Sequence, residues 1–135
     1  MLIVDTNVAA YLLIEGDHTA AAQELHDRDP DWRSEALLLI EFINVLESLI
    51  ATKRITLKLA QDFLGKAIAL FDGKLTRVTH PSVLATAARH GISAYDARFL
   101  ALANQLGHRL VTEDARLRAA APALTQSLAE ALATR

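Results

Sequence analysis

Four acidic residues stand out because of the residue types around them. Asp5 and Asp114 each come directly after a short, strongly apolar run. Glu41 interrupts a stretch that is otherwise apolar, and Asp96 lies near the start of a predicted helix. Carboxylate oxygens without Cys or His ligands suit a hard cation such as Mg²⁺ or Mn²⁺. Such an ion activates water and stabilises a leaving oxygen during in-line attack on phosphorus.

The predicted elements that position these acids alternate between strands and helices. Short β-branched or alternating runs predict strands at 2–4, 32–34, 75–79 and 110–112. Helical spacing and caps predict helices at 6–14, 18–28, 35–52, 56–71, 81–91 and 93–106, and a short one after Asp114. The tail from Ala123 to Arg135 predicts a weak strand and then a helix. We therefore expect one α/β domain, 1–135, with a three-layer α/β/α architecture and a small, mostly parallel central sheet.

This topology brings the four acids to the same edge of the sheet. Active sites of open parallel sheets lie outside the carboxyl ends of the strands, where Asp5 and Asp114 are expected. Crossover helices begin near that edge, which places Asp96 in a first turn and Glu41 within about two turns of a helix start. Two carboxylates ~4 Å apart repel by about 4 kcal/mol at an effective dielectric near 20. Clustering therefore requires protonation or a bound cation.

Each acid also has a simpler interpretation. Asp5 and Asp114 can cap the helices that follow them, and Asp96 can complete a capping box with Ser93. Glu41 can face solvent. The convergence of all four acids, rather than any one of them, favours a functional site.

Composition limits the alternatives. The chain has 135 residues, 14 Lys and Arg against 16 Asp and Glu, a formal charge of −2, and no cysteine. A disulfide scaffold and a cysteine metal site are excluded. The N-terminus does not resemble a signal peptide and the apolar runs are too short to span a membrane, so we expect a cytoplasmic protein with no membrane contact.

Four ordered motifs resemble those of PIN domains, especially the VapC-type toxins of bacterial toxin–antitoxin pairs. The chain opens with Leu-Ile-Val-Asp5-Thr6-Asn7. The second motif is Ser34, six residues, Glu41, two residues and Asn44-Val45-Leu46. The third and fourth are Tyr95-Asp96-Ala97, four residues, Leu102-Ala103, and Leu110-Val111-Thr112-Glu113-Asp114, two residues, Leu117.

The resemblance implies an Mg²⁺- or Mn²⁺-dependent endoribonuclease that acts on RNA and serves as the toxin of a type II toxin–antitoxin pair. By this resemblance, the catalytic and metal-binding residues are Asp5, Glu41, Asp96 and Asp114, of which Asp5 and Asp96 are the firmest ligands. Thr6, Asn7 and Thr112 would orient carboxylates or metal-bound water. Many members form homodimers and bind a small antitoxin protein along their N-terminal helices.

Other residues near the expected site are weaker candidates for contacts with RNA or with a protein partner. Arg98, Arg116 and Arg118 are candidates for contacts with RNA phosphates, although solvation or ion pairing is the more common role of such arginines. Glu113 is expected to be solvated. Apolar side chains could dock a partner or pack in the core, the latter being the more common use: Ala20, Ala21, Leu25 and Leu49.

Three other functions stay open. One is a non-catalytic RNA- or protein-binding module that keeps the fold. Another is a general RNA-processing nuclease without an antitoxin. The third, a phosphotransfer enzyme with an Asp5 nucleophile, is disfavoured because Asn7 stands where the haloacid-dehalogenase type has a second Asp, and receiver-domain residues are missing.

Overall fold

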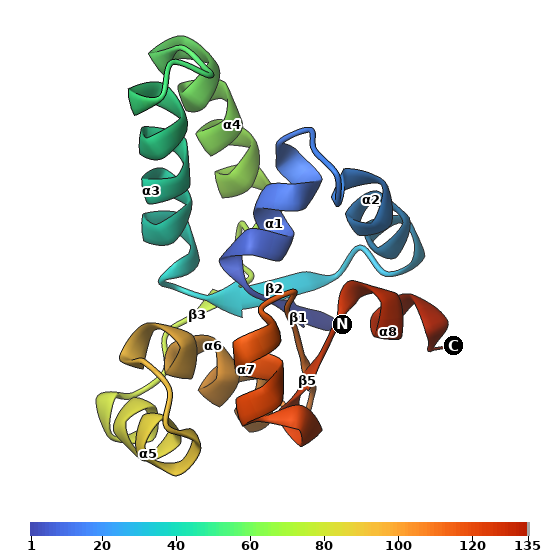
Figure 1. Ribbon diagram of the computed structural model, residues 1–135, viewed down its shortest axis with the longest axis vertical. Helices are drawn as coiled ribbons and strands as arrows, with labels where there is room; N and C mark the ends of the chain where they lie inside the picture. Colours follow the sequence, from blue (N-terminus) through green and yellow to red (C-terminus); the bar gives the residue numbers. More distant parts are fainter. Residues whose placement is uncertain (135) are drawn as a thin grey trace.

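The computed structural model describes residues 1–134 and has the predicted three-layer α/β/α architecture (Figure 1). The sheet has five strands in the order β3-β2-β1-β4-β5. All four strand pairs are parallel. The strands are β1 (Leu2–Val4), β2 (Trp32–Glu35), β3 (Leu75–Thr76), β4 (Leu110–Val111) and β5 (Thr125–Gln126). The expectation of a small, mostly parallel sheet is confirmed.

Helices cover both faces of this sheet. The α1–α4 segment and α8 lie on one side in Figure 1, whereas α5, α6 and α7 lie on the other. None of the helices in residues 1–134 is long and apolar enough to cross a membrane. The helices are α1 (Thr6–Leu13), α2 (Thr19–Arg28), α3 (Leu38–Ala51), α4 (Leu57–Leu70), α5 (His80–His90), α6 (Ala94–Gln105), α7 (Ala115–Ala120) and α8 (Leu128–Ala133).

The central strands are buried because helices pack on both of their faces. Ile3, Val4, Leu110 and Val111 have no exposed surface, as expected of apolar runs inside a parallel sheet. Helix α6 lies across β1, β2 and β4 on one face. A second apolar cluster holds the α3–α4 hairpin to α1, through residues that include Phe42, Leu46, Ala60 and Ala67.

Strand order creates the crevice that the site requires. Along the chain, β2 and β3 are added on one side of β1, and β4 then pairs with the other side of β1. Ligands of open α/β sheets bind at such a reversal, outside the strand ends. The register pairs Ile3 with Leu110 and Val4 with Val111, so Asp5 and Thr112 follow the two strands at the same level.

Several predicted boundaries were wrong, most clearly at the start of α3. The helix predicted from 35 begins instead at Leu38, because Glu35 belongs to β2, where it pairs with Thr76. Strand β3 ends at Thr76 rather than 79, and β4 ends at Val111 rather than 112. The predicted tail strand and helix are present as β5 and α8, while Arg135 lies outside the described residues.

Two of the four side chains suggested for partner docking lie in or against the core. Leu25 is buried, and the half-buried Ala21 packs against the main core. Ala20 is exposed and Leu49 is half-buried. This outcome follows from the helical spacing, because Ala21 and Leu25 are four residues apart and share the inward face of α2.

The α6 packing against the sheet predicts a large effect of Leu100→Ala. Leu100 is fully buried, so the substitution should lower the free energy of unfolding by about 2–5 kcal/mol. Urea unfolding followed by circular dichroism measures this change. Leu84→Ala is the matched control, since Leu84 on α5 is 72% exposed and should change stability by less than about 0.5 kcal/mol. Equal losses in both variants would contradict the packing described here.

Candidate active site

The four predicted acids line one open pocket of about 240 Å³ at the carboxyl edge of the sheet. Asp5 comes from the end of β1, Glu41 from α3, Asp96 from α6, and Asp114 from the segment after β4. Thr6 and Asn7 also line the pocket. Four segments that are distant in sequence therefore bring carboxylates to one place, as the topology predicted.

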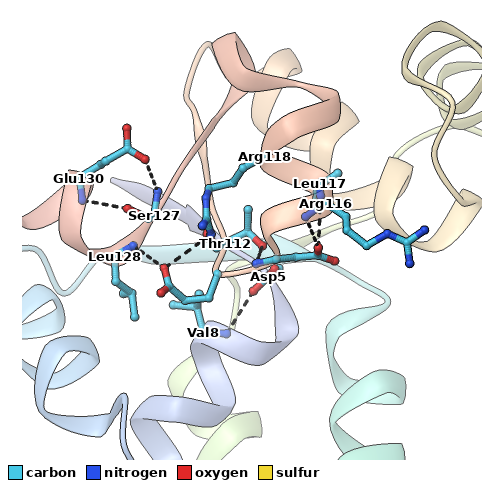
Figure 2. Close-up of polar contacts among 11 residues, drawn as sticks. Asp5, Val8, Thr112, Arg116, Leu117, Arg118, Ser127, Leu128 and Glu130 are labelled. Carbon is cyan, nitrogen blue, oxygen red and sulfur yellow. Dashed lines mark hydrogen bonds and ion pairs between the residues drawn. The ribbon is translucent and has the colours of Figure 1, made fainter.

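Asp5 is fixed by its backbone position and by hydrogen bonds. It is the N-cap of α1, and its Oδ1 accepts a hydrogen bond from the Val8 N–H at 3.1 Å (Figure 2). The Thr112 side chain also interacts with the Asp5 carboxyl and lowers its pKa. Thr112 itself is fully buried beneath the pocket. Capping and membership of the pocket are thus compatible roles of the same residue.

Glu41 is held by one of the predicted supporting residues. The buried Thr6 hydroxyl donates a hydrogen bond of 2.6 Å to Oε1 of Glu41. This contact joins the first turn of α1 to the first turns of α3. The bond holds the Glu41 side chain toward the pocket. The simpler interpretation, in which Glu41 only faces solvent, does not describe this orientation.

Asp96 makes only half of the predicted capping box. Its backbone N–H donates to Ser93 Oγ at 3.1 Å. A return bond from the Ser93 N–H to the Asp96 carboxylate is absent from the described structure. At the start of α8, by contrast, both bonds form between Ser127 and Glu130 (Figure 2). The Asp96 carboxylate therefore does not accept the capping hydrogen bond that a complete capping box would require of it.

Asp114 begins the short helix α7. Its Oδ1 accepts hydrogen bonds from the N–H groups of Arg116 at 2.9 Å and Leu117 at 3.2 Å (Figure 2). The Asp114 N–H donates in turn to Thr112 Oγ1 at 3.1 Å. Thr112 thus touches both Asp5 and Asp114, and it links the acids that follow the two central strands.

Electrostatic crowding is visible in the pKa values of the two more enclosed aspartates. Burial raises the pKa of Asp5 from 3.8 to about 6, and the nearby charges of Glu41 and Asp96 add to this effect. Hydrogen bonds from Thr112 and Val8 act in the opposite direction. The pKa of Asp96 is also raised, first by burial and then by the charge of Asp114. Like charges therefore face one another across the pocket.

The residues present fit a hard divalent cation by their chemistry. All the acidic ligands offer oxygen, and a cation would offset both the burial and the neighbouring charges that raise the pKa of Asp5. Within residues 1–134, no three His, Cys, Asp or Glu side chains already stand in metal-ligand geometry. Binding an ion would therefore require small side-chain movements that draw the acids together.

Two of the three arginines proposed to contact phosphate have protein partners instead. Arg98 makes an ion pair with the buried Glu35 at 3.0 Å. Arg118 donates to the Thr112 carbonyl at 3.0 Å. Arg116 is exposed, and Figure 2 shows its side chain directed away from the α7 cap. These contacts of Arg98 and Arg118 match the more common role of such arginines, and contact of either residue with RNA stays a prediction.

Sequence reasoning also misjudged or missed other polar residues. Glu113 was expected to be solvated, yet its Oε2 accepts a hydrogen bond of 2.8 Å from the Leu128 N–H (Figure 2). Asn44 lines the pocket, and its position three residues after Glu41 was a usable helical signal. Glu35 had no such signal, since its role depends on contacts with residues that are 43 and 63 positions away in the chain.

The raised pKa of Asp5 predicts a pH-dependent cost to the metal-free fold. The folded state binds the proton more tightly than the unfolded state does, so stability falls as pH rises from about 4 to about 6. In chelator-treated protein at pH 7.5, Asp5→Asn should therefore raise the free energy of unfolding by about 1–3 kcal/mol.

Urea titrations at pH 4 and pH 7.5 measure this effect, and the gain should vanish at pH 4. The exposed Asp62→Asn on α4 is the control and should show no comparable change. A gain in Asp5→Asn that is the same at both pH values would argue against a perturbed carboxylate at this position.

Comparisons with known proteins agree with this geometry. The structure is similar to the crystal structure of PAE2754 from Pyrobaculum aerophilum, with a TM-score of 0.76 and 22% sequence identity over 98% of this chain and 97% of that chain. No curated protein sequence gives a significant match. The family model for the PIN domain matches residues 2–122. PIN domains are generally nucleases and typically use divalent metal ions. The chain belongs to the PIN domain family.

Proposed function

We propose that this chain is a single-domain, Mg²⁺- or Mn²⁺-dependent endoribonuclease that hydrolyses RNA phosphodiester bonds. The observation that carries the proposal is the convergence of Asp5, Glu41, Asp96 and Asp114 on one pocket. Their mutual repulsion is unfavourable for the fold, and it becomes useful when a cation binds between them. Membership of a family of nucleases supports the same activity.

In this proposal the four acids together ligate the ion. By the resemblance of the motifs, Asp5 and Asp96 are the firmest ligands, and both line the pocket. Asp114 and Glu41 complete the set. Bound Mg²⁺ or Mn²⁺ supplies an activated water and neutralises charge on the scissile phosphate. The products would be a 3′-hydroxyl and a 5′-phosphate.

The supporting residues keep the carboxylates aligned. Thr6 fixes Glu41 by its 2.6 Å hydrogen bond. Thr112 interacts with Asp5 through its side chain and accepts from the Asp114 N–H. Asn7 is exposed at the pocket, where its amide can orient water or a phosphate oxygen. The protein thereby limits how far each acid must move when an ion binds.

The surface around the acids suits a strand that continues past the cut. A second pocket, of about 370 Å³, shares Asp96 and Asp114 with the first and extends to Arg116. A nucleic acid strand can therefore contact the protein on both sides of the acidic cluster, as internal cleavage requires. Arg116 is the arginine of the original three that is placed to meet a phosphate. Bound cations offset the net charge of −2.

The four ordered motifs also support a role as a toxin of a type II toxin–antitoxin pair. In that role the protein acts in the cytoplasm, forms a homodimer and is restrained by a small antitoxin protein. Apolar side chains exposed on α3 and α4 offer surface for such partners: Ile40, Ile43, Leu57, Leu59 and Ile68. A neighbouring gene that encodes a small DNA-binding protein would favour the toxin over a general RNA-processing nuclease.

Cleavage of RNA tests the proposed activity. Wild-type protein with Mg²⁺ should cut an RNA pool, and both EDTA and Asp5→Asn should lower the rate by about 100-fold or more, because each removes part of the cation site. Gel analysis of end-labelled RNA measures the rate. Asp62→Asn is the control and should cut at the wild-type rate. Equal cleavage by Asp5→Asn and wild type would remove Asp5 from the mechanism.

Stability in Mg²⁺ separates the nuclease from a binding module that merely keeps the fold. A cation site should stabilise the protein by about 2.7 kcal/mol when free Mg²⁺ is at 100 times its dissociation constant. Thermal unfolding with and without Mg²⁺ measures the gain, which Asp5→Asn should reduce. Stabilisation without cleavage of any RNA would favour the binding module. Absence of stabilisation would contradict the cation site itself.

A further inference from the structure

Glu35 is a buried carboxylate that lies outside the pocket and joins four parts of the fold. It is the last residue of β2 and has no exposed surface. Its Oε1 accepts a hydrogen bond of 2.6 Å from the Leu37 N–H. Its Oε2 accepts from the Val78 N–H at 3.1 Å and from Arg98 Nε at 3.0 Å, and it forms an ion pair with Arg98 Nη2 at 3.0 Å.

The first of these bonds leads directly to Glu41. Leu37 is the N-cap residue of α3, and its own side chain cannot cap the helix. Oε1 of Glu35 accepts instead from the N–H of Leu37 itself, one of the backbone donors at the helix start that have no partner within the helix. The carbonyl of Leu37 in turn accepts a hydrogen bond of 3.0 Å from the Glu41 N–H. Two consecutive hydrogen bonds therefore connect Glu35 to the backbone of a pocket acid.

The ion pair leads to Asp96. Arg98 is two residues after Asp96 on α6. Its Nε–H donates a hydrogen bond to Oε2 of Glu35, and its Nη2 lies 3.0 Å from the same oxygen as an ion pair. Two-point contact by a planar group restricts rotation of the side chain and of the helix turn that carries it. The orientation of the Asp96 side chain on α6 therefore depends on the contact with Glu35 at the end of β2.

Stability alone is a poor explanation for this arrangement. Buried ion pairs contribute little net stability compared with apolar residues of similar volume, because both charges lose their hydration. This pair instead connects the starts of the two helices that carry Glu41 and Asp96, on opposite walls of the pocket. We infer that Glu35, with Arg98, is a positioning residue that sets the separation of these two acids, an inference that rests on the proposed cation-dependent function.

The test compares variants that separate positioning from stability. Arg98→Met leaves the Glu35 carboxylate buried without its partner and should lower the thermal midpoint. The double variant Glu35→Met, Arg98→Met removes both charges and should recover part of that loss, because the Leu37 and Val78 N–H groups still lose their acceptor. Arg98→Lys keeps the charge but cannot make the two-point contact, and it serves if the double variant does not fold. Arg89→Met, at an exposed site on α5, is the control.

Two measurements are made on each variant. Amide hydrogen exchange of metal-free protein reports the α3 start, and the Leu37 and Glu41 N–H groups should exchange about tenfold faster or more in the double variant. Mn²⁺ binding, followed by electron paramagnetic resonance, should weaken by about 10-fold in the double variant and measurably in Arg98→Lys, even where the thermal midpoint is normal. Arg89→Met should match wild type in both.

Each outcome decides a different statement. Normal exchange and normal Mn²⁺ affinity in a stable double variant, or in Arg98→Lys if the double variant is unfolded, would overturn the positioning role. If the double variant regains Mn²⁺ affinity to the same extent as it regains its thermal midpoint, the positioning role is also overturned, and the pair is purely structural. If wild type itself binds no Mn²⁺, the proposed cation site fails, and the exchange data alone then decide whether Glu35 orders the start of α3.

Discussion

Repulsion among carboxylates is the constraint on which the rest of this structure depends. Burial raises the pKa of Asp5 to about 6, and the nearby charges of Glu41 and Asp96 add to the rise. Such crowding lowers stability, and it is tolerated because surrounding contacts fix each acid separately. Thr6 holds Glu41, Thr112 joins Asp5 to Asp114, and helix caps fix Asp5 and Asp114. The scaffold is therefore organised around charges that it does not neutralise itself.

The architecture and the membership of the pocket were predictable because they follow from local pattern and simple topology. Buried β-branched runs identify β1 and β4, and parallel pairing places Asp5 and Asp114 at one edge. Helix caps identify the start of α6 and hence the position of Asp96. Glu41 followed from its place in an apolar helix. These signals lie within a few residues of the positions that they specify.

The surrounding polar network was not predictable because its contacts are long-range. Glu35 resembles a helix-initiating residue in sequence, yet register with Thr76 makes it the end of a strand. Arg98 resembles a surface arginine, and only the packing of α6 against β2 brings it to Glu35. Glu113 meets the start of α8 through the return of the chain after β5. In each case a distant partner determines the environment of the side chain.

The most direct test of the central claim is to locate a divalent ion by anomalous scattering in crystals grown with Mn²⁺. The account predicts one strong peak in the pocket, within ligand distance of Asp5 and of at least one other acid among Glu41, Asp96 and Asp114. It also predicts loss of that peak in Asp5→Asn. Well-ordered crystals of wild type at neutral pH and saturating Mn²⁺ with no peak in this pocket would contradict it.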